Sequence, residues 1–81
     1  MGNVLNEVRK ERERQLGKWG VQNHNMLEWC VILGEEVGEV NRAVYEHHFN
    51  KEKGKLEEYR EELIQVAAVA VAMVECLDRN K

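Results

Sequence analysis

The sequence predicts an all-α protein, and three observations support this fold class. The chain has 81 residues and no proline, so no residue in it has to interrupt a helix. Fourteen of its fifteen acidic residues are glutamate, which favours helix together with lysine, arginine, alanine, leucine and methionine. Two long segments repeat apolar residues at steps of three and four, the period of a helical face. This length fits a single domain, residues 1–81.

The composition excludes several classes of function. Since the chain has no serine and no threonine, it can hold neither a Ser-His-Asp triad nor the glycine-rich phosphate loop that needs one of these residues. A formal charge of −3 disfavours nucleic acid as a partner. The longest apolar run, residues 66–74, is too short to span a membrane, and the first twenty residues lack a secretory signal. We therefore expect a cytoplasmic protein without a membrane partner, with buried thiols at Cys30 and Cys76.

Three helices are predicted along the chain. The first covers residues 3–16 and ends near Gly17, and a loop follows it. The second covers residues 26–48. After a polar turn at residues 50–54, the third covers residues 55–78. The order of elements is therefore helix, loop, helix, turn, helix.

The second helix is predicted to begin with a capping box. Asn25 is a favourable N-cap residue, and Glu28 stands three positions later, where its side chain can reach back to the N-cap backbone. One apolar seam then follows the helix at alternating steps of four and three. Its members are Met26, Cys30, Leu33, Val37, Val40 and Val44.

The third helix carries apolar residues on nearly all sides. One seam contains Tyr59, Val66, Val69, Met73 and Cys76 or Leu77, and the opposite side contains Ile64, Ala67, Ala68, Val71 and Val74. A helix that is apolar on all sides has to be buried on all sides. In a bundle of three helices, two neighbours cannot cover every side of the third. We therefore expect a homodimer whose paired helices complete a four-helix-type bundle, or a tetramer.

Carboxylates also point toward the apolar sides of both long helices. At about 100° per residue, Glu36 falls inside the apolar side of the second helix and Glu39 at its border. Glu62 lies in the middle of the first seam of the third helix, between Glu58 and Gln65. Each long helix therefore turns at least one carboxylate inward.

An ionised carboxylate in apolar surroundings is costly unless something compensates its charge. The inner sides carry no lysine or arginine, because Arg42 and Arg60 fall on other faces of their helices. Oxygen ligands at this spacing suit a hard cation such as Mg²⁺ or Mn²⁺. Two alternatives are open: these glutamates lie at a solvated edge of the bundle, or they pair with arginine from another subunit.

The acidic residues resemble the motifs of the MazG-type, all-α nucleoside triphosphate pyrophosphohydrolases. Residues 35–39, Glu-Glu-Val-Gly-Glu, resemble the EExxE motif of this family. Residues 61–65, Glu-Glu-Leu-Ile-Gln, stand where the family has its ExxD motif, on the next long helix. Residues 19–24 are similar to the Trp, Gln and His run that precedes the first motif in relatives such as dCTP pyrophosphatases. The resemblance spans residues 10–78 and implies a helical bundle completed by dimerisation.

The resemblance implies Mg²⁺-dependent hydrolysis of a nucleoside or deoxynucleoside triphosphate to the monophosphate and pyrophosphate. Carried over by position, the metal ligands would be Glu36, Glu39 and Glu62, with Gln65 where the family has Asp. An amide offers an oxygen but no charge. We therefore expect weaker Mg²⁺ binding, with Mn²⁺ as a possible substitute and Glu58 as an alternative ligand.

The remaining roles follow from the same resemblance. Glu35 or Glu61 would accept a proton from the attacking water, and Lys18 or, second, Arg14 would bind phosphate. An alternative role for these two cations is ordinary surface charge.

The base would be bound by Trp19, Gln22 and His24, although Trp19 as an apolar plug at the bundle end is an equal alternative. A second class of function is also open: a catalytically inactive helical oligomer that binds a nucleotide or another protein. Gln65 is the residue that favours it.

Overall fold

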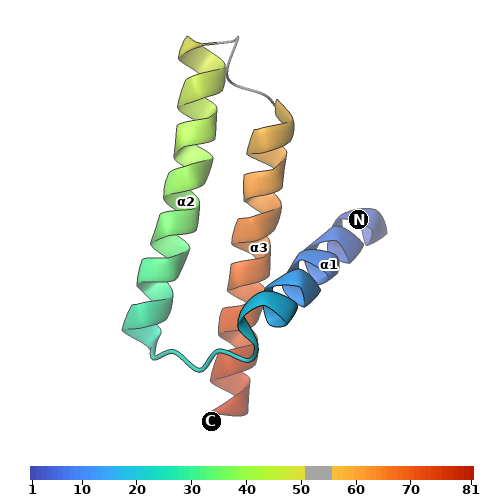
Figure 1. The fold of residues 1–81 in the computed structure, drawn as a ribbon, viewed down its shortest axis with the longest axis vertical. Coiled ribbons are helices and arrows are strands. Elements are labelled where there is room, and N and C mark those ends of the chain that lie inside the picture. Colours follow the sequence, from blue (N-terminus) through green and yellow to red (C-terminus); the bar gives the residue numbers. More distant parts are fainter. Residues whose placement is uncertain (51–55) are drawn as a thin grey trace.

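The computed structural model describes residues 1–50 and 56–81, and this part of the chain is helical without any strand (Figure 1). Helix α1 covers Gly2–Trp19, α2 covers Met26–Phe49 and α3 covers Leu56–Arg79. The predicted all-α fold class and the three helices are confirmed. Apart from Asn50, the predicted polar turn at residues 50–54 lies outside the described residues.

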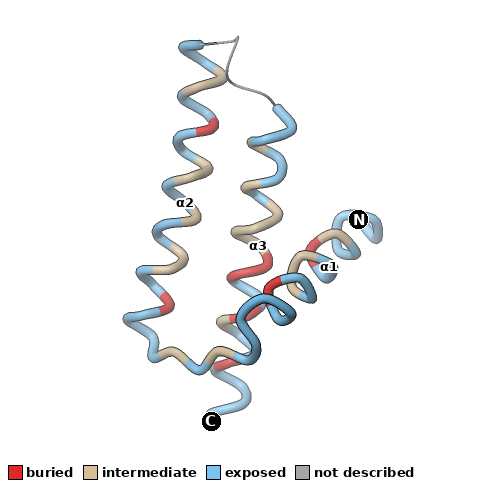
Figure 2. The backbone as a smooth tube through the Cα atoms, viewed as in Figure 1, coloured by how far each residue is buried: buried red, intermediate tan, exposed pale blue. Residues whose placement is uncertain are grey.

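Helix α3 is the element on which the other two pack. Helices α2 and α3 run antiparallel side by side, and α1 lies obliquely against α3 (Figure 1). Within the described residues, α1 does not pack on α2. The buried positions accordingly lie where the helices face one another (Figure 2).

The first helix is longer than predicted, so the prediction that it ends near Gly17 is wrong. It continues to Trp19 and ends at Gly20, which has a positive φ of 71° that glycine adopts without strain. The Gly20 N–H donates to the Leu16 carbonyl oxygen at 2.8 Å. A glycine inside a helix costs only about 1 kcal/mol, so the later glycine, which closes the last turn, determines where the helix ends.

The predicted capping box of α2 is confirmed. The Glu28 N–H donates to Asn25 Oδ1 at 2.8 Å, and the Asn25 N–H donates to Glu28 Oε1 at 2.9 Å. These two bonds satisfy backbone donors that the first turn would otherwise leave unpaired. The start of α2, and with it the position of every later residue on this helix, is therefore fixed locally.

The main core lies between α2 and α3. It consists of Trp29 from α2 and Val69, Ala72 and Cys76 from α3, and the partly buried side chains packed against it are Ile32, Leu33 and Met73. From α1, Val8 and the polar Gln15 are buried. The core is small, so a large share of the apolar side chains is left outside it.

The side of α2 that α3 covers is rotated away from the predicted seam. Trp29 and Ala43 are buried, whereas four members of the seam, Met26, Cys30, Val37 and Val44, are exposed. The prediction of a buried thiol is therefore right for Cys76 and wrong for Cys30. Periodicity locates the apolar residues of a helix, but it does not say which part of a wide apolar side the chain's own neighbour covers.

Helix α3 is not buried on all sides within one chain. Leu63, Val71, Val74 and Leu77 remain exposed. Met26 and Cys30 of α2 line a single groove of about 710 Å³ together with Val74 and Leu77 of α3. These four residues, Met26, Cys30, Val74 and Leu77, thus lie on one face of the α2–α3 pair, which we call the apolar face.

The capping box provides a test of the local structure. We expect Asn25→Ala to lower the free energy of unfolding by about 1 kcal/mol, because one reciprocal pair of bonds at the start of α2 is lost. Urea unfolding at a fixed protein concentration measures it. The control is Asn41→Ala, an exposed position inside the same helix, where alanine favours helix and no loss is expected. Equal effects of the two substitutions would contradict the role of the cap.

Candidate functional site

Two glutamates from different helices meet at the amide of Gln65. When the Gln65 NH₂ group faces the carboxylates, Nε2 donates to Glu36 Oε2 and to Glu62 Oε2, each at 3.2 Å. The opposite orientation would place the amide oxygen against two carboxylate oxygens. Glu36 comes from α2 and Glu62 from α3, so it is the antiparallel packing of these helices that brings the two carboxylates together.

Both carboxylates are half-buried, as the sequence predicts for their inward positions. The pKa of Glu36 is raised, first by burial and then by the negative charges of Glu39, Glu11 and Glu35, with Arg14 opposing the shift. The surroundings of Glu36 therefore favour the neutral form of its carboxyl group.

Glu62 is in the same situation. Its pKa is raised by burial first, and then by the charges of Glu36, Glu39 and Glu61, with Arg42 opposing. Within the described residues, neither Glu36 nor Glu62 forms an ion pair. The negative charge of this acidic cluster, which we define as Glu36, Glu39 and Glu62, is thus only partly compensated.

Glu39 differs from the other two members of the cluster. Its Oε2 atom lies 2.9 Å from Nη2 of Arg42, one turn further along α2. Arg42 also lies 3.8 Å from Glu46. The sequence places Arg42 on another face of the helix, but its long side chain reaches back to Glu39. One of the three expected ligands is therefore already paired with a cation.

Helix α1 adds two residues to the surroundings of the cluster. Glu11 and Arg14 form a bidentate ion pair, with Nε–Oε1 at 2.9 Å and Nη2–Oε2 at 2.6 Å. The buried Gln15 donates to the same Glu11 carboxylate at 3.3 Å. Sequence reasoning missed Glu11, because it lies in a charged run, residues 9–14, that is typical of a solvated helix face.

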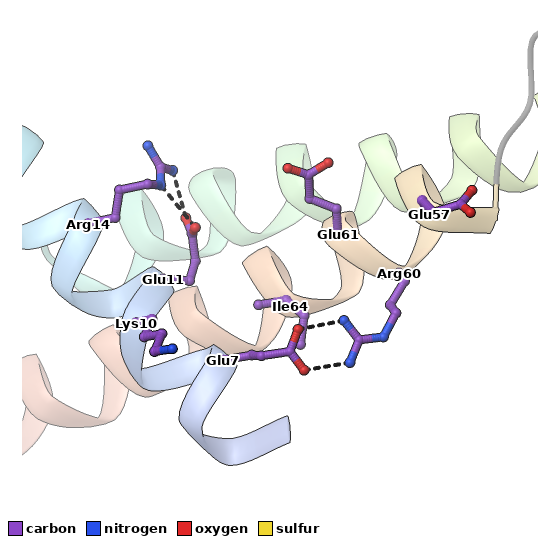
Figure 3. Close-up of a pocket in the computed structure, with 8 residues that line it drawn as sticks. All are labelled: Glu7, Lys10, Glu11, Arg14, Glu57, Arg60, Glu61 and Ile64. Carbon is purple, nitrogen blue, oxygen red and sulfur yellow. Dashed lines mark hydrogen bonds and ion pairs between the residues drawn. The ribbon is translucent and has the colours of Figure 1, made fainter. Parts of the chain in front are cut away.

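A cleft of about 470 Å³ opens between α1 and the first half of α3 (Figure 3). It is lined by Glu7, Lys10, Glu11, Arg14, Glu57, Arg60, Glu61 and Ile64. The Arg14 guanidinium and the Glu61 carboxylate extend to the same side of this cleft (Figure 3). Of the sequence-predicted residues, the structure therefore gathers Arg14 and Glu61 here, next to the acidic cluster.

The other acidic candidates lie at the surface. Glu35 is exposed on α2, and its charge contributes to the raised pKa of Glu36. Glu58 is exposed in the first turns of α3. Neither residue lines the cleft described above.

Lys18 and the predicted base-binding residues lie at the end of α1 and in the loop before α2. The Lys18 ammonium sits 4.7 Å from the centre of the Trp19 ring, a cation–π contact. Trp19 is 51% exposed, so it does not plug the core of the single chain. The Gln22 carbonyl oxygen accepts a bond from Arg79 at 3.2 Å.

His24 packs edge-on against Trp29, with ring centres 4.9 Å apart. Trp29 Nε1 and His24 Nε2 have no hydrogen-bond partner in the described part of the chain. Both residues line the groove of the apolar face. Because Trp29 precedes Glu36 by seven residues, this end of the groove lies about 10 Å from Glu36 along α2.

The donor set of the acidic cluster suits a hard cation, but it is not assembled as a ligand shell. Carboxylate oxygens and an amide oxygen are the ligands that Mg²⁺ and Mn²⁺ prefer. Among the described residues, however, no three His, Cys, Asp or Glu side chains are placed to hold a metal ion. Gln65 would have to turn its oxygen toward the cation, and Glu39 would have to leave Arg42.

Comparisons with protein-family models, curated proteins and solved structures found no match to this chain. None of the described helices is long and apolar enough to cross a membrane. Fold and site therefore define the class of protein on their own: an all-helical domain with an undercompensated acidic cluster between two antiparallel helices.

The raised pKa of Glu36 predicts a pH-dependent stability. Because folding raises this pKa above its ordinary value of 4.5, the folded state binds the proton more tightly, and its contribution to stability is lost as pH rises through the folded pKa. We therefore expect Glu36→Gln to raise the melting temperature at pH 7 in EDTA, and to have no such effect below about pH 4. The control is Glu13→Gln, an exposed residue of α1. A lower melting temperature for Glu36→Gln at pH 7 would contradict this account of the cluster.

Proposed function

We propose that the protein is a Mg²⁺-dependent nucleoside triphosphate pyrophosphohydrolase, which splits its substrate into the nucleoside monophosphate and pyrophosphate. One observation carries the proposal: Glu36 and Glu62, from consecutive helices, share the Gln65 amide while no cation pairs with them within the described residues. A site with surplus carboxylate charge has a physical reason to bind a divalent cation. The resemblance of residues 35–39 and 61–65 to the MazG-type motifs supports the choice of reaction.

The cation would be held by Glu36 and Glu62, joined by Glu39 and by the oxygen of Gln65 after its amide turns. When bound, it supplies positive charge for the phosphate oxygens and makes water a stronger acid. Gln65 contributes no charge, so the affinity for Mg²⁺ is lower than with an aspartate, and Mn²⁺ is the expected substitute.

The remaining steps belong to the side chains around the cluster. Glu61 is exposed, lines the cleft and lies one residue from Glu62, so it is the better placed of the two proposed general bases. Glu35, on the exposed side of α2, is the other. The base would accept the proton of the attacking water.

For phosphate binding, Arg14 takes precedence over Lys18. Arg14 lines the cleft, and its charge acts on Glu36, whereas Lys18 lies over Trp19. The nucleoside would extend toward the start of α2, where Trp19, Gln22 and His24 are proposed to bind the base. The half-exposed ring of Trp19 is available for stacking there.

We also propose that the protein is a homodimer formed through the apolar face. Met26 is 78% exposed and Leu77 is 54% exposed, and the groove between them is lined by α2, α3 and residues 23–25. A second α2–α3 pair on this face completes a four-helix-type bundle, and two such dimers make the expected tetramer. The two free thiols, Cys30 and Cys76, accord with the proposed cytoplasmic location.

A catalytically inactive nucleotide-binding or protein-interaction module is the second candidate. The Gln65 amide donates to both Glu36 and Glu62, and Glu39 is paired with Arg42. A cluster that is stable in this form can persist in a protein that has lost catalysis. The measurements below separate this candidate from the enzyme.

Pyrophosphate release tests the enzymatic proposal. With a panel of canonical and modified nucleoside triphosphates and Mg²⁺ or Mn²⁺, we expect release that falls at least about 100-fold in Glu36→Gln and Glu62→Gln, and not in the control Glu13→Gln. Gln65→Asp should tighten Mg²⁺ binding about tenfold, because it adds a fourth carboxylate. No release with any nucleotide, at high protein concentration, would exclude the enzyme, and metal-dependent nucleotide binding without release would favour the binding module.

Light scattering at micromolar concentration tests the assembly. We expect the wild-type chain to be a dimer or tetramer, and Leu77→Glu and Val74→Glu to be monomers, because a charge on the apolar face would be buried without a partner. Leu5→Glu is the matched control: Leu5 is 58% exposed but lies on α1. A monomeric wild-type protein, or a dimer that survives both substitutions on the apolar face, would contradict the interface.

A further inference from the structure

The cleft between α1 and α3 holds three cations whose bonding differs (Figure 3). Arg60 of α3 donates from both terminal nitrogens to the Glu7 carboxylate of α1. This bidentate pair joins the two helices, and Arg60 is therefore committed to holding α1 in place. Lys10 and Arg14 stand four positions apart on α1, so they lie on the same side of that helix.

Arg14 is bound in a way that contributes nothing to the docking of α1. Its partner Glu11 belongs to the same helix, and the side chain of Arg14 is half-exposed. Glu11 has a further bond from the buried Gln15, so its carboxylate keeps a donor if Arg14 leaves. Within the described residues, Lys10 forms no ion pair. Both cations can turn to a ligand without loosening the contact between α1 and α3.

Arg14 also lies within the field of the acidic cluster. Its pKa is raised first by the bond with Glu11 and further by the charges of Glu11, Glu36 and Glu61. In return, Arg14 is the cation that opposes the raised pKa of Glu36. The guanidinium therefore bonds to an acid of its own helix and also interacts with the charge of Glu36, a member of the acidic cluster.

We propose that this cleft is a polyphosphate site, in which Arg14 exchanges its bond to Glu11 for a bond to a phosphate group and Lys10 supplies a second cation. The inference rests on the proposed function and adds to it, because it assigns Lys10 and the release of Arg14 from Glu11. A phosphate accepts the same bidentate geometry from arginine that the Glu11 carboxylate accepts. The Arg14 side chain is about half-exposed, so its guanidinium is accessible to a ligand in the cleft.

The four carboxylates of the cleft set a condition on this binding. Glu7, Glu11, Glu57 and Glu61 line it together with Lys10, Arg14 and Arg60, so the lining carries more negative than positive charge. A polyphosphate that arrives with a divalent cation has a smaller negative charge than the free ion, so this lining repels it less. The ligand class is therefore a metal-bound polyphosphate chain, whether inorganic or the tail of a nucleotide.

Calorimetric titration with inorganic tripolyphosphate and Mg²⁺ tests the proposal. We expect Arg14→Gln to weaken binding about tenfold and Lys10→Gln about threefold, since each removes a charge-assisted bond. Arg9→Gln is the matched control, an exposed cation of the same helix, and should bind within about twofold of wild type. Glu11→Gln should tighten binding severalfold, because the competing acceptor loses its charge. The melting temperature of each variant shows whether it is folded.

The opposite effects of the Arg14 and Glu11 substitutions separate the exchange from a structural role. If the Arg14–Glu11 pair only stabilised α1, both substitutions would lower the melting temperature and neither would tighten the binding of tripolyphosphate. Wild-type protein that binds no tripolyphosphate, or an Arg14→Gln variant that binds it like wild type, would overturn the proposal. If the Arg14→Gln variant binds tripolyphosphate like wild type and still releases pyrophosphate from a nucleotide, the polyphosphate site is wrong and the proposed function stands. Tripolyphosphate binding that depends on Arg14 and Glu11, without any nucleotide hydrolysis, would support the polyphosphate site and contradict the proposed enzymatic function.

Discussion

The contact of Glu36 and Glu62 through the Gln65 amide depends on the antiparallel packing of α2 on α3. Each helix presents a carboxylate on a largely apolar side, and within the described residues neither of these two carboxylates forms an ion pair. Burial raises the pKa of both groups, and the charge of Glu36 raises the pKa of Glu62 further. The packing that builds the core thus also brings the carboxylates of the acidic cluster together.

Helix α3 serves two neighbours, and this explains why so much apolar surface remains. Its side toward α2 carries Val69, Ala72 and Cys76, and its side toward α1 is held by ion pairs at both ends, Arg60 with Glu7 and Arg12 with Glu75. A third side remains apolar and exposed. Since α1 packs on α3 and the groove is lined by α2, α3 and residues 23–25, a second copy can cover the apolar face while the α1–α3 cleft stays accessible.

The sequence predicts the helices and the inward placement of Glu36 and Glu62 because both depend on local rules. Helical period and capping chemistry act within a few residues, and the capping box at Asn25 is confirmed in both of its bonds. The exposure of Cys30 and the part played by Glu11 could not be predicted. They depend on which part of an apolar side α3 covers and on the oblique angle at which α1 lies, and no local pattern encodes either.

Gln65 shows why an amide fits this cluster better than an acid when no metal ion is bound. It can donate to both carboxylates at once, which an ionised aspartate cannot do, and it adds no charge to groups whose pKa burial already raises. A fourth carboxylate would strengthen metal binding and, in the absence of metal, would increase the repulsion among Glu36, Glu39 and Glu62. The same amide has an oxygen to offer to a cation once it turns. The residue that departs from the MazG-type pattern therefore limits the repulsion within the cluster, and Arg14 of α1 opposes the raised pKa of Glu36.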